Sequence, residues 1–319
     1  MELNGKKIRI LITGGNGFIG SHVVDALVER DNWQVGLVLR KGSDFSKIDK
    51  FLKDDNGIQK FTLGDLSIEE VVSRFRPYLV IHLAAFFHSN SPSDIEKLIE
   101  TNILFPTKIL DAMTKYGTGF FINTGTFSEY MIKRESFALD DEICPVNLYS
   151  ATKVGFEEIL KYYTTRMNIN AVTLKLSAVY GPRDNPRKLI PYLINSAIMN
   201  KKADVTLGEQ TWDYVYVKDV ARAYTSAIEY LITSRKSYTD FCIGSGYSHN
   251  VREVAGIIRE MSGHLEVGWG EIPYRDQETF FFRTDITKAR NMLRWLPRYS
   301  LREGLQETFN YYRELIKNE

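Results

Sequence analysis

The sequence predicts an α/β protein built on a doubly wound parallel sheet. Two observations predict it. Short apolar runs alternate with longer amphipathic segments through the first half of the chain, and the spacing between runs leaves room for helical crossovers. Strands separated by helix-length crossovers form parallel sheets. Ligands bind beyond the carboxyl ends of such strands, so the residues that follow each run are the first candidates for a site.

The expected elements of the first half follow in chain order. Each predicted strand is a short apolar run, and the first is followed by a helix from about Phe18. The predicted strands are Ile8–Ile12, Val35–Leu39, Gln59–Leu63, Leu79–Leu83, Gly119–Asn123 and Asn170–Leu176. A further helix between the last two of these carries Tyr149.

The pattern loosens at residues 180–186, a turn-rich stretch that fits an exit from the first domain. Beyond it we expect a helix near 189–200, strands near Val205 and Tyr214, a helix from Lys218 and a strand at 240–243. The last two elements have the same helix and strand pattern as the first half of the chain. We therefore expect a first domain over residues 1–180, with 218–245 returning to it, and a smaller α/β domain from 181–217 and 246–319.

Composition narrows the classes of partner. The 319 residues include 41 basic and 40 acidic side chains, for a net charge of +1, so the electrostatic footprint of a nucleic-acid binder is missing. The first residues show no leader-like segment and no stretch approaches the length of a membrane span, so we expect a cytoplasmic protein with no membrane partner. Cys144 and Cys242 offer neither a disulfide framework nor metal-ligand spacing, and no metal is expected.

A glycine loop follows the first predicted strand directly. In the stretch Thr13–Gly20, TGGNGFIG, three glycines have the spacing GxxGxxG. Such glycines permit a tight strand-to-helix turn and let a pyrophosphate approach the amino end of the helix, as in a Rossmann-type dinucleotide fold. The alternative is a purely structural turn. The residues expected to contact a dinucleotide are Gly14, Asn16, Gly17, Phe18 and Ile19.

The end of the second strand bears on the choice of cofactor. A fold that prefers NAD usually has an acid there for the ribose hydroxyls, but this chain has Arg40 and Lys41. Two cations suit a 2′-phosphate, which favours NADP(H) over NAD(H). In the alternative, both are solvated surface charges and Asp44 reaches the ribose. Past the third strand, Asp65-Leu66 is placed to meet the adenine, or else caps a helix.

Three side chains form a candidate catalytic group. Tyr149 and Lys153 lie four residues apart on a predicted helix, so the phenol and the ammonium share one face. A tyrosine is a poor acid or base near neutral pH unless a nearby cation stabilises its phenolate, and Lys153 could supply that cation and lower the Tyr149 pKa. Thr124, after the fifth strand, adds a hydroxyl that could orient a carbonyl while Tyr149 protonates its oxygen.

Over nearly its whole length the chain resembles the extended short-chain dehydrogenase/reductases, a branch of sugar-nucleotide epimerases, dehydratases and reductases. The motifs that carry the resemblance are TGGNGFIG at 13–20, IHLAA at 81–85, TNI at 101–103, PVNLYSATK at 145–153, AVYGP at 178–182, DYVYVKDV at 213–220 and LRWLP at 293–297. The resemblance implies a Rossmann-type domain for the dinucleotide and a smaller α/β domain for a nucleotide sugar.

Residue roles follow from the same resemblance. It makes Tyr149 the acid/base, with Lys153 as a partner that also holds the nicotinamide ribose. Thr124 would polarise the reacting carbonyl, and Thr126 is the competing candidate. The remaining residues implied to line the cofactor are Leu83, Ala84, Ala85, Asn102 and Val179.

The resemblance also implies contacts with the substrate. Lys188 matches the start of a nucleotide-contacting helix, and Arg275 matches an arginine that clamps the diphosphate, unless it only pairs with a neighbouring carboxylate. His88 and Asn90 fall where a loop could meet the sugar. His82, inside the fourth strand, is interpreted as a core histidine.

Departures from the family pattern guide the choice of reaction. The Asp-Glu pair of the dehydratases is replaced by Gly125-Thr126, which argues against water elimination. Arg40 and Lys41 favour a reductase that consumes NADPH over an epimerase that keeps NAD bound. The leading hypothesis is reduction of a nucleotide-linked 4-keto-6-deoxyhexose, the second is a nucleotide-sugar 4-epimerase, and the third is a non-catalytic NADP-binding regulator.

The resemblance implies a homodimer as well. Relatives commonly pair through a four-helix bundle that includes the catalytic helix. Four apolar residues suit either that interface or an ordinary buried face: Phe156, Ile159, Leu160 and Tyr163.

Overall fold

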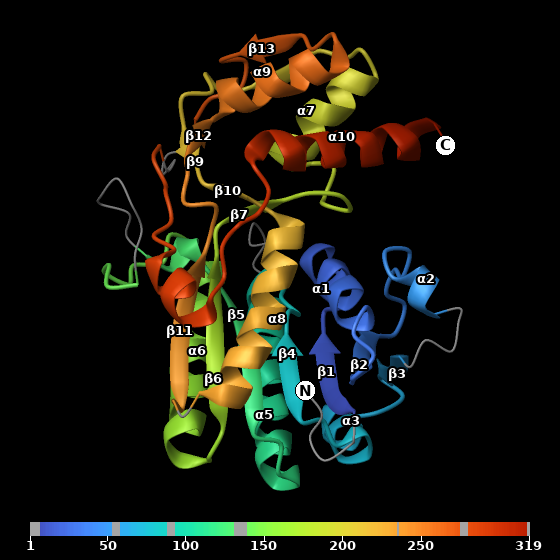
Figure 1. Cartoon of the computed structure of the whole chain (residues 1–319), viewed down its shortest axis with the longest axis vertical. Helices are drawn as coiled ribbons and strands as arrows, with labels where there is room; N and C mark the ends of the chain where they lie inside the picture. Colours follow the sequence, from blue (N-terminus) through green and yellow to red (C-terminus); the bar gives the residue numbers. More distant parts are fainter. Residues whose placement is uncertain are drawn as a thin grey trace. The chain divides into compact units, whose positions relative to one another are not determined.

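A seven-stranded sheet with strand order β11-β6-β5-β4-β1-β2-β3 forms the centre of the first of two units (Figure 1). The computed structural model describes residues 7–52, 58–87, 93–130, 139–234, 236–274 and 280–317. Unit 1 comprises Met1–Met131, Glu142–Lys175 and Ala221–Phe241, and unit 2 comprises Ile132–Asp141, Leu176–Val220 and Cys242–Glu319.

The strands of the sheet are β1 (Ile8–Thr13), β2 (Trp33–Arg40), β3 (Ile58–Leu63), β4 (Leu79–His82), β5 (Phe120–Thr126), β6 (Asn170–Leu176) and β11 (Tyr238–Ile243). Every pairing from β3 through β2, β1 and β4 to β5 is parallel. The helices are α1 (Phe18–Val28), α2 (Asp49–Leu52), α3 (Ile68–Phe75), α4 (Ser93–Ile99), the π-helix η1 (Glu100–Leu104), α5 (Phe105–Tyr116), the 3₁₀ turn η2 (Phe127–Glu129), α6 (Leu148–Arg166) and α8 (Val217–Thr233). The predicted fold class is confirmed.

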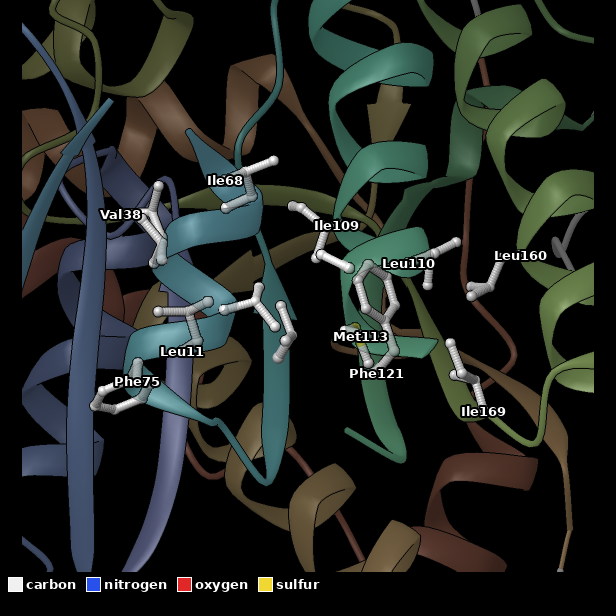
Figure 2. Close-up of a cluster of buried hydrophobic side chains, with 14 of the residues drawn as sticks. Leu11, Val38, Ile68, Phe75, Ile109, Leu110, Met113, Phe121, Leu160 and Ile169 are labelled. Carbon is white, nitrogen blue, oxygen red and sulfur yellow. The ribbon is translucent and has the colours of Figure 1, made fainter. Parts of the chain in front are cut away.

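One face of the sheet packs against α3, α5 and α6. Every other residue of a strand points to the same face, and on this face the strands contribute Leu11, Val38 and Phe121 to a buried apolar cluster. Figure 2 shows these side chains together with those of α5 and α6. The cluster includes Phe156 and Leu160 of α6, neither of which is accessible to solvent. The packing fixes α6, the helix that bears Tyr149, against the sheet.

The described residues of unit 2 form three short strand pairs and a group of helices. Its elements are β7 (Ala178–Tyr180), α7 (Leu189–Ile198), β8 (Ala203–Val205), β9 (Thr211–Trp212), β10 (Tyr214–Tyr216), β12 (His249–Asn250), α9 (Val251–Ser262), β13 (Val267–Trp269), the π-helix η3 (Ala289–Leu293) and α10 (Leu301–Lys317). β7 pairs with β10, β8 with β13, and β9 with β12.

A buried carboxylate organises the centre of unit 2. Asp213, between β9 and β10, accepts hydrogen bonds from the backbone N–H groups of Ser245 (2.7 Å), Gly246 (3.0 Å) and Thr284 (3.0 Å). The hydroxyl of Ser245 adds a fourth, also at 2.7 Å. Because four donors converge on one side chain, three separate segments are held together without a continuous sheet.

Across the described ranges, we find no helix that combines the length and the apolar character needed to cross a bilayer.

Candidate active site

The candidate site is built in unit 1 from the carboxyl ends of β1, β4 and β5 and from the first turns of α1 and α6. These three strands are neighbours in the order β5-β4-β1, so their ends lie along one edge of the sheet. The backbone N–H of Leu83 donates to the carbonyl of Thr13 (3.0 Å), which ties the end of β4 to that of β1. The sequence therefore brings the glycine loop and the IHLAA motif together.

The glycine loop has the geometry of a phosphate cradle. Gly14 has φ +73°, and a Cβ there would lie 2.5 Å from the backbone nitrogen of Ala84, so only glycine fits. The N–H of Gly17 donates to the carbonyl of Gly14 (3.0 Å), which closes the turn. Gly17 is also the N-cap of α1, and no side chain caps this helix. The amino end of α1 is thus suited to an anion, which fits the pyrophosphate of a dinucleotide.

Asn16 connects this loop to the segment after β2. Its side-chain amide donates to the carbonyl of Asp44 (3.0 Å). The carboxylate of Asp44 accepts from the backbone N–H and the hydroxyl of Ser46, both at 2.9 Å, and these hydrogen bonds lower the pKa of Asp44. Both oxygens of Asp44 are therefore engaged locally, which weakens the alternative that Asp44 binds the ribose.

Arg40 and Lys41 lie at the end of β2, where both are exposed. Lys41 forms an ion pair with Asp65 (3.4 Å), so one predicted phosphate ligand contacts the residue predicted to meet the adenine. The alternative role of Asp65 as a helix cap is wrong, because Ser67 caps α3 by accepting from the N–H of Glu70. Leu66 forms an isolated bridge with Leu63 beside these charges.

His82 is a core residue, as interpreted from the sequence. Its Nδ1 lies 2.7 Å from the hydroxyl of Thr13, and burial lowers its pKa well below the ordinary histidine value. The ring is therefore neutral at physiological pH. Its backbone carbonyl has a separate role, because it accepts from the hydroxyl of Thr124 (2.8 Å) and so joins β4 to β5 at the site.

Asn102, which is expected to line the cofactor, holds the loop after β4 through its side-chain amide. Its Oδ1 accepts from the N–H of Phe86 (2.8 Å), and its Nδ2 donates to the carbonyl of Phe86 (3.0 Å) and to the hydroxyl of Thr152 (3.0 Å). The side chain is buried, so protein partners occupy its amide. Asn102 thereby fixes the segment containing Ala84 and Ala85 to α6.

The two candidate hydroxyls have different surroundings. Thr124 donates to His82, and its Oγ1 lies 2.6 Å from the phenolic oxygen of Tyr224 on α8. Thr126 is the N-cap of η2, and its hydroxyl contacts the N–H and the hydroxyl of Ser128. The hydroxyl network at the strand ends therefore includes Thr124, whereas Thr126 serves a local turn.

Tyr149 stands in the first turn of α6. Asn147 begins this helix by accepting from the N–H of Ser150 (2.9 Å). Burial, with a smaller contribution from the charge of Glu129, raises the pKa of Tyr149 above the ordinary tyrosine value. The phenol is therefore protonated in the free chain. The expected net lowering of this pKa by Lys153 is wrong for the free chain, because desolvation outweighs any attraction between the two groups.

Lys153 lies one turn further along the same face, with 2% of its surface exposed. Burial lowers its pKa to about 8, against the opposing influence of Glu129 and Glu157. Beside Tyr149, the ring of Phe87 makes an edge-to-face contact with centroids 4.8 Å apart, although Phe87 is 70% exposed. A partly buried phenol and a buried amine whose pKa is about 8 have the properties of a proton relay.

The remaining predicted residues are placed as follows. Val179, in β7, pairs with Val215, and Lys188, the N-cap of α7, forms an ion pair with Asp184 (2.9 Å); both belong to unit 2. His88, Asn90 and Arg275 lie outside the described residues. Within the described ranges, no group of three His, Cys, Asp or Glu residues could hold a metal.

Sequence reasoning missed several residues around this site. Tyr224 and Phe87 contact Thr124 and Tyr149, and a buried ion cluster around Lys175 lies behind them. One signal for the cluster was available. Lys175 is the one charged residue of a mostly apolar strand, and a lysine there must find a buried partner.

Comparisons with known proteins agree with this geometry. A model of the NAD dependent epimerase/dehydratase family matches residues 10–244. The chain is 29% identical to CDP-abequose synthase from Salmonella typhimurium over 313 residues, which cover 93% of this chain and 96% of that protein. UDP-glucose 4-epimerase from Thermotoga maritima, solved with UDP-glucose, has a TM-score of 0.84 at 28% identity, covering 97% of this chain and 100% of that one. UDP-glucose 4-epimerase from Thermus thermophilus, solved with NAD, has a TM-score of 0.79 at 25% identity, covering 96% and 99%.

Proposed function

Because the chain belongs to the NAD dependent epimerase/dehydratase family, we propose that it modifies a nucleotide-linked sugar, as an NADPH-dependent reductase of a 4-keto-6-deoxyhexose. The choice of a reductase rests on the side chains at the end of β2. Arg40 and Lys41 are exposed there, and the carboxylate of Asp44 is engaged with Ser46. Two neighbouring cations favour a 2′-phosphate, although Lys41 also pairs with Asp65, and a cofactor consumed at each turnover suits reduction.

The residues present fit a nicotinamide dinucleotide. The glycine loop and the amino end of α1 would hold the pyrophosphate, and Arg40 with Lys41 would hold the 2′-phosphate. Leu83, Ala84 and Ala85 follow β4 beside Gly14, where they would line the same site. When bound, the nicotinamide supplies the hydride.

The protein's own part in the chemistry is the movement of a proton. Tyr149 is protonated in the free chain, so it can give its phenolic proton to the carbonyl oxygen as that oxygen gains charge. Lys153, when protonated, stabilises the phenolate that remains. In the free chain the one hydroxyl proton of Thr124 is donated to the carbonyl of His82, so Thr124 would have to turn this proton towards the substrate's carbonyl oxygen when the sugar binds. Solvent then returns a proton to Tyr149.

The position after Thr124 supports the exclusion of a dehydratase. A Cβ on Gly125 would lie 2.7 Å from Cδ of Lys175 and 3.0 Å from Oε1 of Glu129. An aspartate could not be placed there without moving a buried ion pair. The second acid that water elimination would need is missing from this position, and Gly125 leaves room for one only if Lys175 shifts, which supports a reaction other than dehydration.

A second candidate is a nucleotide-sugar 4-epimerase with NAD. It is favoured by the likeness to the Thermotoga maritima epimerase over nearly the whole chain. The pairing of Lys41 with Asp65 also leaves this cation less available for a phosphate.

The two functions are separated by cofactor consumption. The purified chain, stripped of any bound nucleotide, is mixed with NADPH and a panel of 4-keto nucleotide sugars, and the absorbance of NADPH is followed. We expect one NADPH consumed per sugar reduced, and none with Tyr149→Phe. Stoichiometric bound NAD, with interconversion of 4-epimers and no NADPH consumption, would assign the epimerase.

Four residues are proposed to bind the nucleotide sugar. Lys188 and Arg275 are proposed for its phosphates, and His88 with Thr126 for its hexose. Lys188 is half exposed at the start of α7, where an ammonium paired with Asp184 could exchange this partner for a phosphate. Substitution of Lys188 by Ala should raise the KM for the sugar nucleotide and leave that for NADPH unchanged.

The proposed assembly is a homodimer. Phe156 and Leu160 pack in the core of unit 1 and are not available for an interface. Apolar side chains that are available include Ile95 and Ile99 of α4 and Tyr162 of α6. Light scattering after size exclusion should give twice the 36.7 kDa chain mass.

A further inference from the structure

A cluster of buried charges lies behind the candidate catalytic group. Lys175, on β6, forms ion pairs with the Oε2 atoms of both Glu129 and Glu157, and all three side chains are buried. One ammonium and two carboxylates leave this triad with a net charge of −1. Burying ions is costly, and replacement of a buried ion pair by apolar residues often stabilises a protein. Stabilisation of the fold alone therefore does not explain why this triad is present.

One end of the triad fixes the turn that carries the candidate hydroxyls. Oε1 of Glu129 accepts from the backbone N–H of Thr126 at 2.8 Å, while Oε2 faces Lys175. Gly125 lies directly against both side chains, since a Cβ there would be 2.7 Å from Lys175. The two oxygens of Glu129 thus join the backbone after Thr124 to the buried ammonium.

The other end of the triad shares a helix face with the catalytic pair. Tyr149, Lys153 and Glu157 follow one another at intervals of four residues on α6, which places them along one side. Lys153 and Glu157 are both buried. Adding the ammonium of Lys153 to the triad gives two positive and two negative charges, so the buried group as a whole is neutral.

The geometry points to Glu129 as a positioning residue: it holds the end of β5 through Thr126 and supplies the negative charge that balances the buried ammonium of Lys153. This inference deepens the proposed function, because it rests on the role given there to Lys153. Glu129 need not touch the substrate. It acts through the turn and through the charge state of Lys153.

The directions of the influences on the Lys153 pKa agree with this role of Glu129. Burial lowers the pKa of Lys153 to about 8, Glu129 and Glu157 raise it, and Lys175 lowers it. The other titratable groups packed around the cluster are Tyr130 after η2, His82 of β4, Tyr149 and Lys161 of α6, and Tyr238 and Asp240 of β11. His82 is neutral, and burial raises the pKa of each of the three tyrosines. Burial also raises the pKa of Glu129, while the ammonium of Lys175 opposes this shift and favours the carboxylate. The charges of the cluster therefore come from the two glutamates and from Lys153 and Lys175, and Lys161 and Asp240 add one charge of each sign at its edge.

The test is the titration of Lys153 in Glu129→Gln, read without any substrate. The chain is labelled at lysine Cε with ¹³C, and the Lys153 signal is assigned by its loss in Lys153→Met. Removing one opposite charge nearby should lower the midpoint of the Lys153 titration by about one pH unit or more. In the enzyme assay, the alkaline limb of kcat should move to lower pH by the same amount. Glu129→Asp, which keeps the charge, should restore the midpoint.

Glu157→Gln is the matched control for charge. It removes one of the two carboxylates that pair with Lys175 and leaves the hydrogen bond to Thr126 in place. The Lys153 midpoint should therefore fall here too. At low pH, kcat should stay closer to the wild-type value than in Glu129→Gln. If Glu129→Gln does not fold, the Lys153 midpoint in Glu157→Gln tests whether the carboxylates of the triad set the charge state of Lys153. The kcat of Glu129→Asp, whose side chain is shorter, then tests whether the hydrogen bond to Thr126 positions the turn.

An unchanged Lys153 midpoint in both Gln variants, with kcat lowered equally at every pH, would overturn the inference. Failure of the proposed function is distinguishable. In that case the Lys153 midpoint still moves, while no 4-keto sugar nucleotide is reduced by the wild-type chain.

Discussion

The phenolic oxygen of Tyr224 lies 2.6 Å from Oγ1 of Thr124, across 100 residues of sequence. Thr124 gives its own proton to the carbonyl of His82, so the Tyr224 hydroxyl is the donor of the pair. The chain of hydrogen bonds orients the hydroxyl proposed to meet the reacting carbonyl. It also gives α8, whose role is otherwise packing, a direct connection to the site.

Tyr224→Phe should therefore impair catalysis without unfolding the protein. The substitution removes one hydroxyl, and a hydrogen bond of this kind contributes about 1 kcal/mol, so kcat should fall by about 3- to 10-fold. Thr124→Val should cost more, since it removes the hydroxyl that acts directly, and Thr126→Val should cost less. Steady-state kinetics of the three variants decide the order. A larger loss for Thr126→Val than for Thr124→Val would transfer the role to Thr126.

Gly14→Ala should destabilise the chain and abolish cofactor binding. The new methyl group would meet the backbone of Ala84 in a left-handed conformation that alanine avoids. Gly117, with φ +75° and nothing within 4 Å of its Cβ position, is the matched control. Gly117→Ala should cost only about 1 kcal/mol of backbone strain and leave cofactor affinity unchanged. Thermal unfolding and a dinucleotide titration measure both effects. Equal losses of dinucleotide affinity in the two variants would show that the glycine loop at Gly14 does not determine cofactor binding.

Arg40→Ala should separate the two cofactors. It removes a cation placed for a 2′-phosphate, which NADH lacks, so the KM for NADPH should rise by tenfold or more while that for NADH changes little. Lys41→Ala is the comparison variant, and because Lys41 pairs with Asp65 its effect should be smaller. Equal changes in both KM values would contradict the preference for NADP(H).

Local sequence patterns predicted the sheet because buried parallel strands are continuous apolar runs. The run Ile8–Ile12 became β1 (Ile8–Thr13), and the glycine loop lies where its spacing placed it. What the pattern could not supply were contacts between distant side chains. The pairing of Lys175 with Glu129 depends on the register of β6 against β5, and the contact of Tyr224 with Thr124 depends on where α8 crosses the sheet.

The contacts of Asn102 are a second example of what the sequence pattern could not predict. A motif places an asparagine near the loop after β4, but only the folded chain shows that its amide is occupied by Phe86 and Thr152. The pKa of Tyr149 is a similar case. A four-residue spacing to a lysine predicts a lowered value, whereas the burial of the phenol, which spacing does not report, raises it.

Activity should fall as the pH rises through about 8. Lys153 must be protonated to stabilise the phenolate of Tyr149, and burial lowers its pKa to about 8. Below that pH the ammonium is present, and above it kcat should decline by up to about tenfold per pH unit. The pH profile of kcat at saturating substrate measures this.

Stability should change in the opposite direction over the same window. The pKa of Lys153 is lowered from 10.5 in the unfolded chain to about 8 in the folded one, so between these values the unfolded chain binds more protons. The contribution of Lys153 to the free energy of unfolding is then full above 10.5 and is lost as the pH falls through 8. Thermal unfolding of the wild type minus that of Lys153→Met, followed from pH 7 to 10.5, isolates this group. A difference that stays constant with pH would show that Lys153 keeps its ordinary pKa, and the decline of kcat near pH 8 would then need another titrating group.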